Sequence, residues 1–205
     1  MIKELIKKSA ALGISYKSYI TLLNHLVSEK KATGIEQTEQ RIHFTKLNVA
    51  RMRRLDKTIV IPEEVTREFQ NINRNQTWLV LLESWCADGA QTIPIINKLV
   101  EGASNIELKI VLRDEHPGLM DNFLTNGARS IPKLIMLDTE FNVLNIWGPR
   151  SGKATRMVEI YKTQNGKIDD VFKKHLQEWY HKDKGEAIIE DLRGLVKQST
   201  MMKTD

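Results

Sequence analysis

The sequence is poor in cysteine: Cys86 is the only one in 205 residues. A single thiol excludes an internal disulfide and, with it, the disulfide-stapled scaffolds of small secreted domains. No apolar run approaches the length of about 20 residues that crosses a bilayer. The first 30 residues also lack the basic start, apolar stretch and small-residue cleavage site of a secretion signal. These absences predict a soluble protein with no membrane partner and favour a cytoplasmic location.

Charge of one sign is not concentrated enough to indicate a nucleic-acid site. The net charge is +5, and the basic cluster Arg51, Arg53, Arg54 and Lys57 would suit an anionic partner. Acidic residues are interspersed through most of the chain, however, as on the solvated faces of helices. Aromatic residues make up 6% of the sequence and are not interleaved with the basic ones, as stacking on bases requires. The composition therefore does not favour a nucleic-acid partner.

Residues 1–72 show helical spacing and no strand signal. Apolar residues recur at helical intervals over 3–12, 15–30 and about 36–55, and 63–72 has the pattern of a short fourth helix. Amphipathic helices must bury their apolar stripes against a neighbouring element. We therefore predict that residues 1–72 form a helical N-terminal extension that packs on the segment after it.

From residue 73 the pattern changes to that of an α/β domain. The first apolar run is continuous, as in a strand that is buried on both faces. The order of elements predicts a central mixed sheet with helices on both faces, in which the first two strands are parallel and the last two antiparallel. We expect this domain to span residues 73–198, followed by a frayed tail, 199–205. The predicted strands cover 78–82, 107–112, 132–138 and 141–147, and the predicted helices 89–101, 116–126, 152–180 with an interruption near 165, and 186–198.

Cys86 lies where the first predicted strand gives way to a helix. A thiol in the first turn of a helix faces unpaired backbone N–H groups and the positive end of the helix dipole. Both favour the thiolate and can lower the thiol pKa below its usual value of about 8.5. Asp88 lies in the same turn, where a carboxylate stabilises the helix start but its charge opposes ionisation of the thiol. Asp88 is therefore a candidate modulating residue.

Four separated features resemble the thioredoxin family over about residues 78–161. They are Trp85-Cys86 at the strand-to-helix turn, Pro94 inside the following helix, Ile131-Pro132 at the start of the third strand, and Gly148 after the fourth. The Trp-Cys-x-Asp motif is similar, more narrowly, to that of a bacterial group of single-cysteine thioredoxin-like proteins with a helical N-terminal extension. The resemblance implies a thioredoxin-like fold with a cis peptide before Pro132, beside the reactive sulfur.

The resemblance does not extend to the second cysteine of the family. The family's attacking sulfur corresponds to Cys86, but the position three residues on is Gly89. A two-cysteine cycle inside one chain is therefore excluded. We expect Cys86 to be the catalytic residue, because it alone can supply the thiol.

The neighbours of the sulfur are the candidate substrate-binding residues. Trp85 shields one side of it, and the Ile131-Pro132 turn would let a substrate strand pair beside it. Arg129, three residues before Pro132, could present a guanidinium near the sulfur. An equally plausible alternative is an exposed Arg129 that pairs with Asp88 or Asp121.

No metal or other cofactor is expected. The five histidines show no paired spacing with carboxylates of the kind that indicates zinc, and glycine patterns for phosphate or dinucleotide binding do not occur. Iron–sulfur ligation by Cys86 across two chains stays an alternative, although the residues after Cys86 differ from the Cys-Gly-Phe-Ser pattern of single-cysteine glutaredoxins.

Two functions fit these observations best. In the first, Cys86 forms mixed disulfides with a protein or low-molecular-weight thiol, and an external thiol resolves them, as in a monothiol oxidoreductase. In the second, the chain is a redox-inactive interaction module that binds extended peptides near Pro132. The missing second cysteine, together with Asp88, favours the module, whereas the position of Cys86 favours the thiol chemistry.

Overall fold

The computed structural model describes residues 2–201, with side chains up to 197, and the chain divides into two compact units. The first unit is Met1–Pro149 and the second is Arg150–Asp205. The expected extension, 1–72, and the strands that follow it therefore belong to one unit, because the helices of 2–72 pack on the sheet. Among the described residues, no helix is both long and apolar enough to span a membrane.

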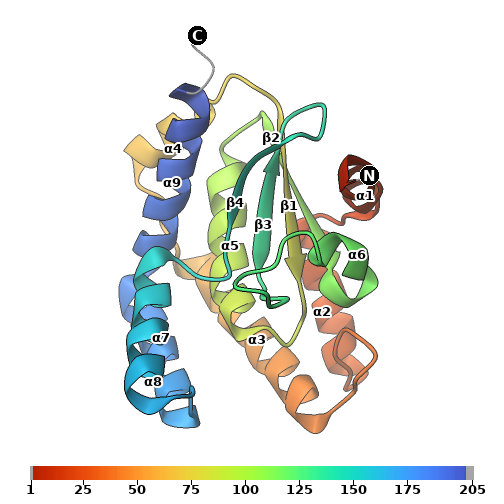
Figure 1. Ribbon diagram of the computed structural model, residues 1–205, viewed down its shortest axis with the longest axis vertical. Helices are drawn as coiled ribbons and strands as arrows, with labels where there is room; N and C mark the ends of the chain where they lie inside the picture. The colour runs from red at the N-terminus through yellow and green to blue at the C-terminus, as the bar shows by residue number, and fades with distance from the viewer. Residues whose placement is uncertain (1, 202–205) are drawn as a thin grey trace. The chain divides into compact units, whose positions relative to one another are not determined.

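A four-stranded mixed sheet forms the centre of the first unit (Figure 1). Its strand order is β2-β1-β3-β4, with β1 parallel to β2 and antiparallel to β3, and β3 antiparallel to β4. The prediction of a mixed sheet, with its first two strands parallel and its last two antiparallel, is confirmed. The strands are β1 Gln76–Leu82, β2 Ile106–Leu112, β3 Lys133–Leu137 and β4 Val143–Trp147.

The two central strands are buried on both faces. Consecutive residues point to opposite faces of a sheet, yet Trp78 to Leu82 in β1 and every residue of β3 are buried. Helices therefore cover both faces, which explains why the β1 sequence is continuously apolar rather than alternating. The helix after β1 is α5, Ala87–Glu101, and it carries Pro94 in its interior.

The helices before the sheet pack on it and on α5. Helix α3 contacts α5, α2 contacts α3, and α1 contacts β2. Between α1 and α2 the chain forms an antiparallel bridge with the edge strand β2, in which Ile14 and Ile110 exchange N–H···O bonds of 2.9 and 2.8 Å. This bridge covers part of an exposed strand edge. The helices are α1 Ile2–Leu12, α2 Tyr16–Ser28, α3 Glu39–Thr58 and α4 Glu63–Gln70.

The helix expected over 116–126 is shorter than predicted. A 3₁₀ turn, η1 Arg113–Glu115, precedes the short helix α6, Pro117–Met120. The chain then makes a tight turn in which Thr125 and Ala128 exchange backbone hydrogen bonds, with Asn126 and Gly127 at φ of 50° and 75°. Two consecutive residues with positive φ are typical of an Asn-Gly hairpin turn. The turn chemistry of this pair therefore overrides the helical spacing.

The second unit contains three helices among its described residues. They are α7 Gly152–Asn165, α8 Asp170–Asp183 and α9 Glu186–Met201. The expected interruption near 165 is present: Gly166 follows α7 with φ of 76°, and the Asp169 side chain caps the start of α8. Tyr161 and Phe172 stack across the break, with ring centroids 4.3 Å apart.

The tail was expected to fray from residue 199. Helix α9 is assigned to Met201, and the sequence from residue 195 to 201 contains no glycine or proline that would end a helix earlier. The tail stays a prediction. The rest of the predicted tail, 202–205, lies outside the described residues.

Candidate functional site

Cys86 is the N-cap residue of α5, at the carboxyl end of β1. Its backbone is extended, with φ of −74° and ψ of 111°, and its Sγ accepts a hydrogen bond from the Gly89 N–H at 3.3 Å. The residue is 8% exposed. A sulfur at this position takes the place of the oxygen that normally caps a helix, and a backbone N–H directed at sulfur favours the thiolate.

The Ile131–Pro132 segment lies directly beside the sulfur. The peptide between the two residues is cis, and Cys86 Sγ is 3.3 Å from the Ile131 carbonyl oxygen. Gly148 closes this region from the far side, at φ of 108°, where an added Cβ would lie 2.2 Å from the Pro132 carbonyl oxygen. A glycine is therefore required at 148, because any side chain would collide with the backbone that positions Pro132.

Gly89 occupies the position where dithiol relatives carry their second cysteine. A Cβ built there would lie 2.1 Å from Leu82 Cδ1 and 3.4 Å from Cys86 Sγ. Leu82 is 1% exposed and belongs to the core at the end of β1. A second thiol at 89 would therefore require the Leu82 side chain to move.

Asp88 is buried in the first turn of α5, with 8% of its surface exposed. Burial and the charge of the nearby Arg54 lower the pKa of Arg51. The negative charge of Asp88 acts in the opposite direction and partly raises it. Arg51 in turn donates to Asn48 Oδ1 at 2.8 Å. Arg51 therefore offsets part of the charge of Asp88, and the effect of Asp88 on Cys86 stays a prediction.

A buried carboxyl group, Glu83, lies three residues before the sulfur. It is 1% exposed and accepts hydrogen bonds from the Thr33 hydroxyl and, at 2.8 Å, from the Asp114 N–H. Burial raises the pKa of Glu83 above its ordinary range, against the opposing effect of these two bonds. The charges of Cys86 and Glu83 both act on the buried Tyr19 hydroxyl, whose pKa is raised mainly by burial.

Ser84 extends this polar cluster into the N-terminal helices. The Ser84 N–H donates to Thr33 Oγ1 at 2.8 Å, and the Thr33 N–H donates to Ser84 Oγ at 2.9 Å. Thr45 Oγ1 lies 2.7 Å from Ser84 Oγ, and the Asn48 amide donates to the Ser84 carbonyl at 2.8 Å. The segment that carries Cys86 is therefore held by the loop before α3 and by α3 itself.

Trp85 lies at the surface of the site, half-buried, between two arginines. The guanidinium carbons of Arg41 and Arg113 lie 4.5 and 5.0 Å from its ring centroid, within the range of cation–π attraction. The indole N–H donates to the Thr33 carbonyl at 3.3 Å. These contacts fix the orientation of the ring next to Cys86.

Arg129 forms an ion pair with Asp121. Its guanidinium donates to both carboxylate oxygens, at 2.6 and 2.7 Å, and both side chains are about half exposed. This is one of the two pairings that the sequence left as alternatives to a contact with the sulfur. The pair holds the pKa of the Asp121 carboxyl below its ordinary range.

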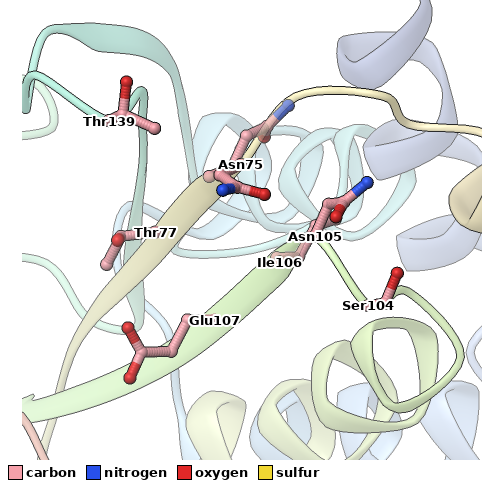
Figure 2. Close-up of a pocket in the computed structure, with 8 residues that line it drawn as sticks. Asn75, Thr77, Ser104, Asn105, Ile106, Glu107 and Thr139 are labelled. Atoms are coloured by element: carbon pink, nitrogen blue, oxygen red, sulfur yellow. The ribbon is translucent and has the colours of Figure 1, made fainter.

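A pocket of about 450 Å³ opens at the other end of the strands (Figure 2). It is lined mainly by amides and hydroxyls around the first residues of β1 and β2. Cys86 lies beyond the opposite end of β1, a strand that is about 20 Å long at the usual rise per residue. Among residues 2–201, no group of three or more His, Cys, Asp or Glu side chains could hold a metal ion. The pocket lining is Asn75, Gln76, Thr77, Ser104, Asn105, Ile106, Glu107 and Thr139.

Comparison with known proteins agrees with this architecture. A sequence model of the thioredoxin family matches residues 34–167, more than half of the chain, and the protein belongs to this family. None of the curated proteins matches the sequence. The narrower group of single-cysteine proteins with a helical extension stays a prediction.

Two solved structures have a similar fold. One is a protein of unknown function from Pseudomonas aeruginosa, with a TM-score of 0.61 and 19% identity over 93% of this chain and 95% of that chain. The other is an HIV epitope-scaffold, with a TM-score of 0.61 and 21% identity over 95% and 96%. At these identities the likeness shows the fold alone.

Several residues of this site were not predicted from the sequence. Thr33, Arg41 and Thr45 lie 40 or more residues before Cys86, and no local pattern links them to it. For Arg113 the sequence indicated only a charged residue after the predicted strand 107–112, with no sign of its contact with Trp85. Glu83 did carry a signal, because an acid that directly follows a run of buried apolar residues needs hydrogen-bond partners. Those partners could not be named without the fold.

Thr33→Val should destabilise the first unit. The substitution keeps the shape of the side chain but removes the hydroxyl that bonds Glu83 and accepts the Ser84 N–H. Leaving buried polar groups unpaired costs about 1–3 kcal/mol, and we expect a loss of this size in the free energy of unfolding, measured by urea denaturation. Thr21→Val is the matched control, because that hydroxyl bonds only the Lys17 carbonyl of its own helix. Equal effects of the two substitutions would contradict the role of Thr33.

Glu83→Gln should change how stability depends on pH. Since the folded-state pKa of Glu83 is raised, the folded protein binds this proton more tightly than the unfolded chain, whose pKa is about 4.3. The contribution of Glu83 to stability is therefore complete below that value and is lost as pH rises through the folded pKa. The unfolding free energy of the wild type minus that of Glu83→Gln should fall over this window. A difference independent of pH would show that Glu83 does not titrate there.

Proposed function

We propose that the protein is a monothiol redox protein in which Cys86 forms mixed disulfides with a protein or small-thiol partner. The observation that carries the proposal is the position of the sulfur. Cys86 Sγ accepts the Gly89 N–H at the start of α5 and lies beside the Ile131 carbonyl. The first contact favours the thiolate, whereas the second stabilises the neutral thiol and must be given up when the sulfur ionises.

The proposed reaction needs two steps and an external thiol. The Cys86 thiolate attacks one sulfur of a disulfide, a Cys86–S–S–R bond forms, and the other sulfur leaves as a thiolate. An external thiolate then attacks the R sulfur of the mixed disulfide, the bond to Cys86 breaks, and Cys86 leaves as the thiolate. A second external thiolate attacks the disulfide so formed, which releases R as a thiolate and joins the two external thiols in a disulfide. Two electrons pass from the external thiols to the substrate. Because the chain has one cysteine, it cannot resolve the intermediate itself. A reducing compartment such as the cytoplasm supplies the thiols that this cycle needs.

The contact between Cys86 and Ile131 also indicates how a substrate would lie. When the sulfur is a thiolate, the Ile131 carbonyl loses its thiol donor. An extended segment whose backbone N–H reached this oxygen would bring its own disulfide next to Cys86, as in strand addition. Ile131 and Pro132 are therefore assigned to substrate binding, and Trp85 to the rim of the site.

A second function is favoured by the burial of Cys86. At 8% exposure, with Sγ engaged by two backbone groups, the residue also has the environment of a structural helix cap. In that case the protein would be a redox-inactive module that binds extended peptides near Pro132. The two functions differ in whether partner binding depends on sulfur.

Reaction with a neutral small disulfide tests the proposal. The reduced protein is incubated with 2-hydroxyethyl disulfide, and intact-mass spectrometry should show one adduct on Cys86 that a reducing thiol reverses. Cys86→Ser should show none. If the folded wild type remains unmodified while the protein in urea reacts, the thiol is a structural cap and the monothiol function is wrong.

Partner capture separates the two functions. Protein partners joined to Cys86 under oxidising conditions are identified by mass spectrometry, with Cys86→Ser as the control. Partners lost from Cys86→Ser and released by reductant support thiol chemistry. Partners bound equally well by Cys86→Ser support the interaction module.

A further inference from the structure

Two arginines that the proposed reaction does not use lie over the ring of Trp85, the residue before Cys86. The first is Arg41, from α3, and the second is Arg113, from η1. Their side chains are only 22% and 18% exposed, so both guanidinium groups are partly desolvated. Desolvation strengthens the attraction between a guanidinium and an anion relative to that in bulk water.

Each arginine already binds one carboxylate of the chain, but the two carboxylates are held differently. Asp114 follows Arg113 directly, pairs with it at 2.8 Å, and has its backbone N–H fixed by Glu83. Glu36 pairs with Arg41 at 2.7 Å, and its side chain is 69% exposed. Because Glu36 is largely exposed, it leaves Arg41 more readily than a carboxylate buried on both sides would. An incoming carboxylate can therefore compete with Glu36 for Arg41.

The loop that carries Glu36 is open to a partner on its outer side. Ile35, next to Glu36, is 97% exposed. The inner side of the same loop is anchored, since Thr33 bonds Glu83, Ser84 and the Trp85 indole. Arg41 is thus held over the Trp85 ring on a fixed frame while its resting partner, Glu36, faces solvent.

We propose that Arg41 and Arg113 select disulfides that carry a carboxylate near the reactive sulfur, and that Glu36 occupies the carboxylate position of Arg41 at rest. The Trp85 ring, which both guanidinium groups contact, supplies an apolar surface for the rest of the disulfide. This inference rests on the proposed thiol chemistry of Cys86. The carboxylate can belong to a small acidic thiol or to an acidic residue beside a protein cysteine.

Two small disulfides test the selection. The rate of thiolate release is measured with 5,5′-dithiobis(2-nitrobenzoate), which carries carboxylates, and with 4,4′-dithiodipyridine, which is neutral. The ratio of the two rates cancels changes in the thiol itself. Arg41→Met should lower this ratio about three- to tenfold, the size expected for the net contribution of one ordinary hydrogen bond. Arg113→Met should lower it in the same direction.

Glu36→Gln should have the opposite effect, because it frees Arg41 without removing a cation. We expect the ratio to rise about two- to fivefold, the range that corresponds to the loss of one exposed ion pair. Glu36 is an exposed loop residue, so its substitution should not disturb the fold. The proposal therefore stays testable even if the arginine variants misfold. Arg67→Met is the matched control, because Arg67 is an exposed arginine on α4 with a single ion pair to Glu63. Its ratio should equal that of the wild type.

The source of the carboxylate is identified with peptides. A cystine peptide with Asp beside the half-cystine is compared with its Asn counterpart in the wild type and in Arg41→Met. Dependence on Arg41 for the peptides assigns the selection to acidic protein segments, and dependence for the small disulfides alone assigns it to acidic small thiols.

Failure of the thiol function and failure of the selection by arginine give different results. If 4,4′-dithiodipyridine does not react with the folded wild type, the thiol function itself is wrong. If both disulfides react and the ratio is the same in the wild type, Arg41→Met and Glu36→Gln, the selection by arginine is wrong while the thiol function stands.

Discussion

The carboxyl group of Glu83 joins three segments of the chain that are far apart in sequence. Thr33 reaches it from the loop before α3, Asp114 from the start of η1, and Glu83 itself ends β1. A carboxyl group that is 1% exposed is costly to bury unless its hydrogen bonds are made. Separating these segments would break those bonds in the core. The N-terminal helices are therefore a structural part of the site rather than an appendage to it.

This constraint fixes the position of the Cys86 sulfur. The turn from Glu83 to Cys86 is held through Ser84 by Thr33, Thr45 and Asn48, so that Cys86 caps α5 with its Sγ against the Gly89 N–H. A second thiol at the family's usual position, here Gly89, would require the Leu82 side chain to move. In the reaction that we propose, the choice of partner comes from neighbouring surface groups such as Arg41 and Arg113.

The parts of the structure that were predictable from the sequence depend on local patterns. The continuous apolar run of β1, the helix that begins after Cys86, and the relative directions of the strands followed from periodicity and connection rules. Helix α6 was predicted too long, because the expected helix was extended to Asn126, which belongs to the Asn126-Gly127 turn. The polar cluster around Glu83 was missed for a different reason. Its members come together only through tertiary packing, and a threonine or arginine on a helix carries no sign of which distant residue it will meet.

The most direct test is the rate at which iodoacetamide alkylates Cys86 at neutral pH in the folded protein, compared with the same protein in concentrated urea. The account predicts faster alkylation in the folded state, because the helix start and the Gly89 N–H favour the reactive thiolate. Slower alkylation in the folded protein than in urea would contradict it and would leave Cys86 as a buried cap of α5.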